Sequence, residues 1–401
     1  MIAEYRQDFN RRFTEAKYRR AVQRTAERVG RAIPFRIAES PIFIPTELLS
    51  EMISASHAII DQLSRNAAYW VEAERIIPGA YRIPHEDAHP LFLLFDYAVA
   101  LDNEGRITPM LTELQGFPSL LAFQYFLSQD FQALYALNPA LRFLCEGLDD
   151  QAFIRLFRQA VLNGHDPENV ALVDVTPWEQ GTLPDFLLTR SLCPGLNIAC
   201  PTELRKRGRK LYYTGQGKEI PIHRIFHRVI WEELTAHEPA MNFRYNEELE
   251  VEWAGHPNWF FKYSKFSLPY LKHRNVPKSY FLDQVNPLPY DLDNYILKPL
   301  FSFSGRGLEL DLTEPMIARI PAAERSAFVL QEKIHFAPAI AALDGAVHCE
   351  IRLMYVWLDQ PVCVMTLPRM SRGRLMGCAY NKTDPWTGHG LAFFPDEATR
   401  A

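Results

Sequence analysis

The sequence contains no long uninterrupted run of apolar residues. A membrane-spanning helix needs about 18 to 20 of them in succession, and no stretch of the 401 residues approaches that length. The first residues, MIAEYRQDFNRRF, are polar and include no apolar signal core. We therefore expect neither a membrane partner nor secretion.

Paired cysteines and an excess of positive charge are also missing. The six cysteines stand at positions 145, 193, 200, 349, 363 and 378, with no CxxC pair among them. Such spacing is typical of reduced thiols and indicates a cytoplasmic protein. The 43 Lys and Arg residues against 48 Asp and Glu give a net charge of −5, so no global field attracts nucleic acid and we expect no nucleic-acid partner.

Internal repeats and low-complexity tracts are absent as well, which excludes solenoids and fibrous proteins. What is present is the composition of an ordinary globular protein, with 48% hydrophobic and 23% charged residues. The length suggests two or three domains. The 12% aromatic content and the 29 prolines favour irregular α+β packing over a helical bundle.

The hydrophobic patterning predicts a mixed α/β chain. Residues 1–75 are expected to be helical, with a charged helix first and an amphipathic helix capped by Thr46 after it. Residues 91–101, LFLLFDYAVAL, read as a buried strand with one acid, Asp96, inside it, and residues 107–114 as its hairpin partner. The middle of the chain is mixed α/β, and the C-terminal third is rich in predicted strands.

The most informative segment is YILKPLFSFSGRGL, residues 295–308. A predicted strand delivers Lys298, and a Ser- and Gly-rich turn follows it. A lysine supplies a point charge for a phosphate, and glycines let backbone N–H groups approach the phosphates closely. The residues of the turn that would contact a nucleotide are Ser302, Ser304, Gly305, Arg306 and Gly307. A plain hairpin with a surface lysine is the alternative, and no P-loop motif is present.

Three further segments carry polar residues in a suggestive order. A strand at 328–334 ends in Gln331, Glu332 and Lys333, which could contact an adenine edge and a ribose. The strand at 348–358 alternates charged and apolar residues and includes Arg352. Arg369 and Asn381 follow.

In order and spacing these segments resemble the ATP-grasp superfamily over roughly residues 290–392. The resemblance implies that ATP lies between two α+β lobes and that a carboxylate is joined to an amine or a similar nucleophile. It implies that Lys298 and Lys333 neutralise phosphate charge, that backbone N–H groups of residues 304–307 cover the phosphates, and that Arg352 and Arg369 stabilise developing negative charge.

The family's magnesium residues usually follow the Arg/Asn segment, but this sequence ends at Ala401 before supplying them. The N-terminal part contains a similar module, with Asp96, Glu113 and Gln115, the last standing where Asn is usual. Its amide oxygen is still a suitable ligand for Mg²⁺. The arrangement is similar to circularly permuted ATP-grasp proteins, including the glutathionylspermidine-synthase-like and peptide-ligase-like groups. The alternative is that Asp96 and Glu113 are only the polar positions of a hairpin.

The middle region resembles the substrate domain that precedes the ATP lobes in such proteins. Arg224 and Arg228 are its candidate substrate-binding residues, because an arginine can clamp a carboxylate bidentately. A structural surface arginine is an equal alternative for Arg228.

Two motifs suggest metal sites of another kind. His85-Glu86-Asp87-Ala88-His89 satisfies HExxH, which binds zinc only when both imidazoles lie on one helix face. Pro84 and Pro90 bracket the segment and disfavour a helix. The second motif is the pair His223 and His227, with no Cys or carboxylate arranged around it.

The sequence thus predicts an α/β protein with a circularly permuted ATP-grasp fold and an α/β substrate domain. The expected parts are a helical segment at 1–75, a metal-site module at 76–130, a substrate domain at 131–268 and nucleotide-binding lobes at 269–401. The expected function is ATP- and Mg²⁺-dependent ligation of a small carboxylate to an amine. A nucleotide-binding scaffold without turnover and a zinc hydrolase are the alternatives, and no oligomeric state is predicted.

Overall fold

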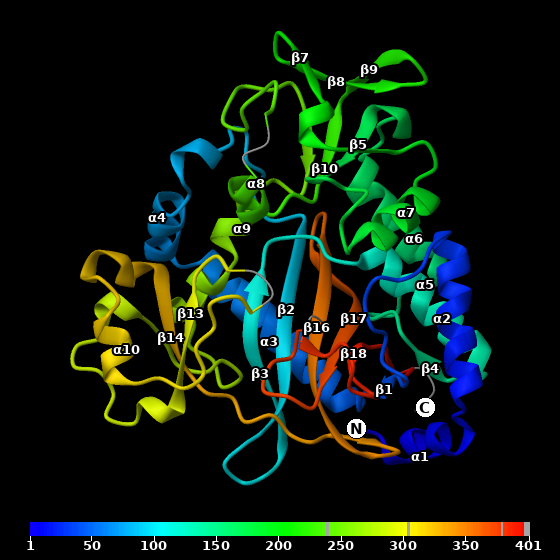
Figure 1. Cartoon of the computed structure of the whole chain (residues 1–401), viewed down its shortest axis with the longest axis vertical. Coiled ribbons are helices and arrows are strands. Elements are labelled where there is room, and N and C mark those ends of the chain that lie inside the picture. The colour runs from blue at the N-terminus through cyan, green and yellow to red at the C-terminus, as the bar shows by residue number, and fades with distance from the viewer. Residues whose placement is uncertain (238–239, 303–304, 378–379, 397–401) are drawn as a thin grey trace.

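A six-stranded antiparallel sheet forms the centre of the protein, seen here in a computed structural model that describes residues 1–237, 240–302, 305–377 and 380–396 (Figure 1). Its strands lie in the order β18-β17-β16-β2-β3, and β15 pairs with one end of β16. They are β2 (Phe92–Leu101), β3 (Ile107–Gln115), β15 (Ile340–Ala342), β16 (Gly345–Trp357), β17 (Pro361–Ser371) and β18 (Gly388–His389). The N-terminal hairpin β2–β3 therefore completes a sheet whose other strands come from the C-terminal part.

The two faces of this sheet have different chemistry because side chains alternate along a strand. Tyr97 points toward helix α3 (Thr46–Ser64), where its hydroxyl lies 3.0 Å from Ser56 Oγ, and Phe95 packs against the Tyr355 ring. Asp96 lies between these two residues and faces the opposite side. The apolar stripe of α3 covers one face, and the charged residues are left on the other.

A second, parallel sheet lies beside the central one, in the order β11-β10-β5-β6. Its strands are β5 (Val170–Val173), β6 (Asn197–Ala199), β10 (Arg224–His227) and β11 (Glu252–Ala254). Helices α6 (Asp150–Leu162), α7 (Leu183–Leu192), α8 (Trp231–His237) and α9 (Trp259–Lys262) accompany it. This part has its own apolar core, which supports an α/β layer in the middle of the chain.

A third sheet of three antiparallel strands forms a small lobe, in the order β12-β14-β13. The strands are β12 (Ser279–Phe281), β13 (Tyr295–Pro299) and β14 (Phe328–Glu332), and the short helix α10 (Glu314–Ala318) accompanies them. Its small core is separate from the others. The lobe therefore includes the predicted strand that carries Lys298.

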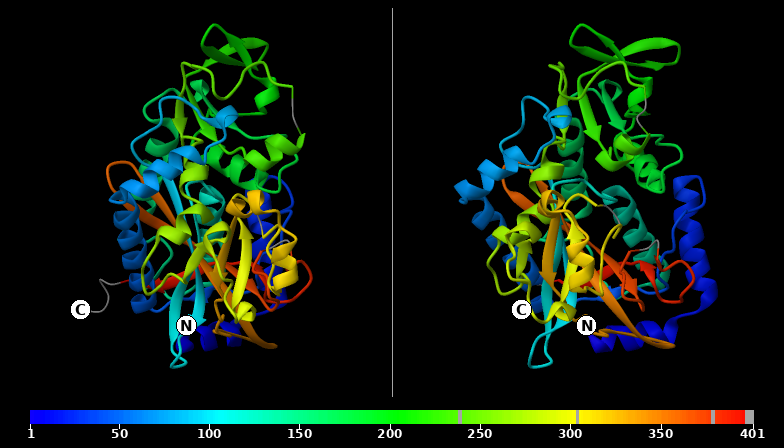
Figure 2. Two further views of the ribbon diagram at one scale, coloured as in Figure 1. Left: turned by 90° about the vertical axis from the view of Figure 1, so that its left-hand side faces the viewer. Right: turned by 60° about the vertical axis from the view of Figure 1, so that its left-hand side comes forward.

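The remaining elements wrap these three parts. Helices α1 (Ala3–Arg12), α2 (Glu15–Val29), α4 (Ala67–Arg75) and α5 (Leu121–Tyr135) lie outside the central sheet, and β1 (Ile42–Phe43), β19 (Ala392–Pro395) and β4 (Leu141–Arg142) form a small sheet. A ribbon of β7 (Arg205–Arg207), β8 (Lys210–Gly215) and β9 (Lys218–Ile222) projects at the end of the molecule opposite the β2–β3 turn (Figures 1 and 2).

Two details differ from the sequence predictions. Thr46 is the first residue of α3 rather than its cap, because Pro45 holds the cap position and makes no side-chain hydrogen bond there. His223 and His227 lie at and within strand β10, not on a helix, because the parallel sheet pairs this segment with β5 and β11. No helix among the described residues has the length and apolar character required to cross a membrane.

Candidate functional site

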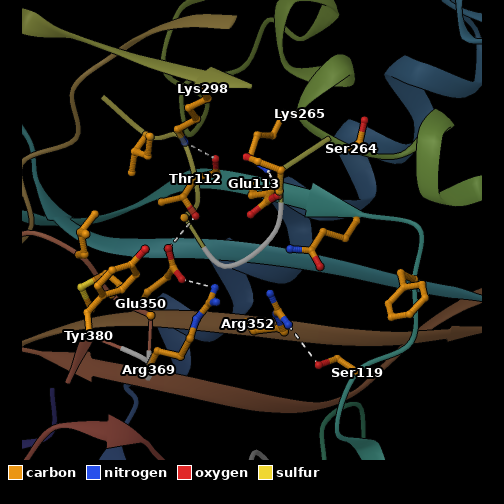
Figure 3. Close-up of a pocket in the computed structure, with 18 of the residues that line it drawn as sticks. Thr112, Glu113, Ser119, Ser264, Lys265, Lys298, Glu350, Arg352, Arg369 and Tyr380 are labelled. Atoms are coloured by element: carbon orange, nitrogen blue, oxygen red, sulfur yellow. Dashed lines mark hydrogen bonds and ion pairs between the residues drawn. The ribbon is translucent and has the colours of Figure 1, made fainter. Parts of the chain in front are cut away.

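A cavity of about 840 Å³ lies where the three sheets meet. Its floor is the charged face of the central sheet, and one wall is the small lobe with Lys298 (Figure 3). The other wall is formed by Asp174 and Arg228, which follow the carboxyl ends of β5 and β10. Ligands of parallel α/β sheets bind outside the carboxyl ends of the strands. The position of the cavity therefore suits a substrate as well as a nucleotide.

Four charged side chains from three strands, three of them buried and Arg369 half-buried, form a cluster at the floor. In the strand register Asp96 lies opposite Arg352, and Glu350 lies opposite Arg369. The Asp96 carboxylate accepts hydrogen bonds from Arg352 Nε at 2.6 Å and Nη2 at 2.7 Å, and from Arg369. Arg369 also pairs with Glu350, and Arg352 Nη1 donates to Ser119 Oγ at 3.2 Å. The two carboxylates and two guanidiniums thus balance in charge.

Burial has opposite outcomes for the two carboxyl groups of this cluster. It would raise the pKa of Asp96, but the guanidiniums of Arg352 and then Arg369 outweigh it and lower that pKa to about 2. For Glu350, burial prevails over Arg369, and the nearby Asp96 charge adds to it, so the pKa is raised. Thr112 Oγ1 donates to Glu350 Oε2 at 2.8 Å.

Two lysines connect strand β3 to the rest of the cavity. Lys298 Nζ donates to the Thr112 carbonyl oxygen at 3.0 Å. Lys265, at the start of a 3-10 segment (Lys265–Tyr270), pairs with Glu113 Oε1 at 2.8 Å. Burial lowers the pKa of Lys298 to about 8, although the Glu113 carboxylate opposes the shift. The ammonium of Lys298 is therefore charged at neutral pH and close to its titration.

Most of the site residues predicted from the sequence line this cavity. They are Glu113, Gln115, Arg228, Lys298, Ser302, Gly305, Lys333, Arg352 and Arg369. Ser304 lies outside the described residues. Segments that are far apart in the sequence therefore come together at one cavity.

Asp96 needs a correction, because it is not placed as a metal ligand. It is 1% exposed, does not line the cavity, and gives both carboxylate oxygens to guanidiniums. Its contacts make it a positioning residue that holds Arg352 and Arg369 toward the cavity.

Arg224 is not placed to bind a substrate. It is buried beneath the parallel sheet, where it donates to the carbonyl oxygens of Val161 and Ala160 and pairs with Glu252. These contacts hold the end of α6 against β10, so the role of Arg224 in this structure is structural.

The polar end of β14 also lies away from the cavity. Gln331 is fully buried, with Nε2 donating to Ser279 Oγ at 3.2 Å. Glu332 pairs with Lys278 on the surface at 3.2 Å. Both side chains belong to the pairing of β12 with β14, and only Lys333 of this predicted group lines the cavity.

Asn381, Arg306 and Gly307 do not line the cavity, and Asn381 and Gly307 support the loops around it. Asn381 accepts from Ser371 Oγ at 2.8 Å and donates to the carbonyls of Leu375 and Gly377, which fixes the turn after β17. Gly307 has φ of 68°, and a Cβ there would lie 2.9 Å from the Pro299 side chain. Glycine is therefore required by the packing of the loop on β13.

Several cavity residues were not predicted. Lys265 lies in an irregular segment with no motif to mark it, and Glu350 was noted only as part of its strand. Asp174 could have been found from its place directly after a buried parallel strand. It is 4% exposed, and burial raises its pKa well above the usual range despite Arg228 nearby.

The residues present fit a Mg²⁺ ion that arrives with phosphates. Mg²⁺ is usually held by one or two carboxylates together with substrate phosphates rather than by a complete protein cage. Glu113 and Gln115 supply a carboxylate and an amide oxygen at the cavity. Within the described ranges no group of three or more His, Cys, Asp or Glu side chains is arranged to hold a metal by itself.

The HExxH segment is engaged in other contacts. No helix spans residues 82–91. His85 Nε2 lies 2.7 Å from Glu248 Oε2, Glu86 pairs with Lys262, and His89 stacks on Trp357. The two imidazoles do not share a helix face, so the geometry that a zinc protease needs is missing here.

Comparison with known proteins bears on the fold. No family model and no curated protein match the sequence. The structure is similar to that of a glutathione synthetase-like effector from Globodera pallida in its apo form, with a TM-score of 0.56 and 11% identity, covering 94% of this chain and 96% of that one. The chain has a glutathione synthetase-like fold. At 11% identity the likeness concerns the fold alone, so the predicted α/β class is confirmed as a mixed α/β fold with several sheets, and the permuted ATP-grasp arrangement stays a prediction.

Replacing Asp96 with Asn is expected to lower the free energy of unfolding by about 3–5 kcal/mol, because it leaves two buried guanidiniums without their shared counter-charge. Urea unfolding measures this. Asp61→Asn, which breaks the exposed Asp61–Arg65 pair, should change it by no more than about 1 kcal/mol. Equal losses in the two variants would contradict the role given to Asp96.

A comparison of the wild type with Asp96→Asn at several pH values tests the pKa of Asp96. A carboxyl group with a depressed pKa stabilises the fold fully above its unfolded pKa of about 3.9 and loses this effect as the pH falls toward 2. The difference in unfolding free energy between the wild type and Asp96→Asn should therefore be constant from pH 7 to 5 and shrink below pH 4. A difference that stays constant down to pH 2.5 would refute the depressed pKa.

Proposed function

We propose that the protein is an ATP- and Mg²⁺-dependent carboxylate–amine ligase that forms an amide or peptide-like bond through an acylphosphate. The proposal depends on one observation above all. Glu113 and Gln115 of β3, Lys298 of β13 and the arginines of β16 and β17 line one cavity in a glutathione synthetase-like fold.

The end of the cavity beside the small lobe suits a nucleoside triphosphate. Lys298, Lys333 and Lys265 offer positive charge, and the loop with Ser302 and Gly305 offers backbone groups. Apolar side chains for a base are close by, at Ile296, Leu308, Leu310, Ile334 and Phe336. Glu113 and Gln115 would hold Mg²⁺, which when bound neutralises phosphate charge and orients the γ-phosphate.

The opposite end of the cavity suits the substrates. Arg228 is 4% exposed and pairs with Asp185 at 2.6 Å, and its buried Nε has no hydrogen-bond partner. It can bind a carboxylate, while Asp174 and Glu233 can attract an ammonium group. A small molecule that carries both a carboxylate and an ammonium group would therefore bind here in one defined orientation.

The chemistry is then a sequence of two displacements. A substrate carboxylate oxygen attacks the γ-phosphorus, and ADP leaves. The amine nitrogen attacks the acyl carbon, loses a proton, and inorganic phosphate leaves. Arg352 and Arg369, held by Asp96, are placed to stabilise the negative charge that develops in both steps, which is commonly the largest catalytic contribution.

Lys298→Ala and Glu113→Ala are each expected to lower ADP formation by at least about 10²–10³-fold, because they remove charge directed at the phosphates or the metal. The assay is a screen of amino acids, polyamines and short peptides for stimulated ADP release. His85→Ala and His89→Ala serve as controls and should stay within about tenfold of the wild type. Near-normal turnover in either folded cavity variant would reject this assignment.

Nucleotide binding should depend on pH through Lys298. Since its pKa in the free protein is about 8, ADP affinity should be constant below that pH and fall by up to about tenfold per pH unit above it, because binding then requires proton uptake. Lys298→Met should bind more weakly and lose this dependence, whereas Lys333→Met should retain it. Isothermal titration between pH 7 and 9.5 measures both, and an unchanged slope in Lys298→Met would contradict the role of Lys298.

A nucleotide-binding scaffold without turnover is the second candidate. It is favoured by the engagement of Asp96 with arginines and by the pairing of Glu113 with Lys265, which leave few free carboxylate oxygens at the cavity. ATP binding without ADP release across the whole substrate screen would support the scaffold.

A further inference from the structure

Lys265 connects the candidate metal ligand Glu113 to Ser302, which follows β13 and lines the cavity. Its Nζ lies 2.8 Å from Glu113 Oε1 and 2.6 Å from the carbonyl oxygen of Ser302. The side chain is only 10% exposed, and Figure 3 shows it beside Glu113 at the cavity. An internal cation therefore lies against the carboxylate that would hold Mg²⁺.

An ammonium group and a metal ion compete for the same carboxylate oxygen. If Mg²⁺ bound Glu113 while Lys265 stayed in place, two cations would share one carboxylate in a largely enclosed site, where charge repulsion is poorly screened. If Lys265 instead moved away without a new partner, a buried charge would be left uncompensated. Metal binding at Glu113 is thus unfavourable until another anion is available for Lys265.

The charge of the whole cavity adds to this effect. Among the described lining residues, eight Lys and Arg side chains face four Asp and Glu side chains. Carboxylates just behind the lining pair with five of these cations: Asp96 with Arg352 and Arg369, Asp185 with Arg228, Asp344 with Arg372 and Asp311 with Arg374. The surface that a ligand meets still carries more cations than anions, so a polyphosphate is attracted to it and a divalent cation alone is not. The electrostatics favour binding of the anion first.

We propose that Lys265 is an exchangeable internal cation that makes metal binding at Glu113 depend on a bound polyphosphate. The inference deepens the proposed function and rests on its metal site at Glu113 and Gln115. When phosphates enter, Lys265 moves from Glu113 to a phosphate oxygen, and Glu113 becomes available to the metal. Only ion pairs and hydrogen bonds are exchanged, and no covalent bond is made or broken.

The same movement affects the segment at Ser302. Lys265 leaves the Ser302 carbonyl when it moves to a phosphate, so one tie between this loop and the 3-10 segment is lost. The turn after β17 remains linked to the small lobe by the bidentate Arg374–Asp311 pair, with both distances at 2.7 Å. The exchange therefore loosens the residues around Ser302 while the cavity mouth stays bridged.

Mn²⁺ binding, followed by electron paramagnetic resonance of the free ion, tests the proposal without turnover. In the absence of nucleotide, Lys265→Met should bind Mn²⁺ at least tenfold more tightly than the wild type, because Glu113 is released. The control is Lys333→Met, which removes an equal charge from the cavity. In the wild type Lys333 donates to the Asp293 carbonyl oxygen and does not pair with Glu113. This control should tighten Mn²⁺ binding less than threefold, and the double variant Glu113→Gln/Lys265→Met should lose the gain.

Addition of a non-hydrolysable ATP analogue gives the second arm. It should tighten Mn²⁺ binding more in the wild type than in Lys265→Met, and it should speed hydrogen exchange at residues 300–302 in the wild type only. Nucleotide-free Mn²⁺ affinities of the wild type and Lys265→Met within threefold of each other would overturn the exchange, and so would an equal gain in Lys333→Met. Failure of the ligase proposal would look different. The wild type would then release no ADP, while the Mn²⁺ affinities of the variants would still differ as described.

Discussion

The bond between the Asp96 carboxylate and the two guanidiniums of Arg352 and Arg369 is the interaction on which the site depends. It joins three strands that come from opposite ends of the chain and places positive charge on the cavity floor. A buried carboxylate without these partners would cost several kcal/mol, and so would the arginines without it. The N-terminal hairpin and the C-terminal strands therefore stabilise each other through this ion pair as well as through the packing of their apolar faces.

The alternation of side chains along β2 explains how this cluster coexists with a large core. Phe95 and Tyr97 face α3 and the aromatic core, while Asp96, between them, lies on the opposite side of the sheet, beneath the arginines that line the cavity. A shift of one residue in register would bury the aromatics against the charges and turn the carboxylate into the core. The same register that stabilises the sheet thus sets the chemistry of its open face.

The sequence predicted β2, β3 and the strands that carry Lys298 and Arg352, because an apolar run or a regular alternation marks each of them. The pairing of β2 with β16, which joins the hairpin of Asp96 and Glu113 to the sheet of Arg352, has no local signal. Only the order of motifs in the resembling family linked these two parts of the chain. The sequence placed Asp96 wrongly as a metal ligand, because the partner of a buried acid is decided by strand register. Gln331 and Arg224 lie away from the cavity, in contacts with β12 and α6 that the sequence does not mark. Lys265 stands in an irregular segment whose position only tertiary packing determines.

The long separation of β2 from β16 in the sequence has a consequence for folding during translation. Asp96 and Arg352 are 256 residues apart, and at about 5–20 residues per second translation takes roughly 13–50 s to bridge that gap. Throughout this interval the strand FLLFDYAVAL, with nine of its ten residues destined for burial, has no partner on its β16 edge. An unpaired apolar strand edge is a template for aggregation, so the nascent chain depends on its early helices or on a chaperone to shield it until the last third has been made.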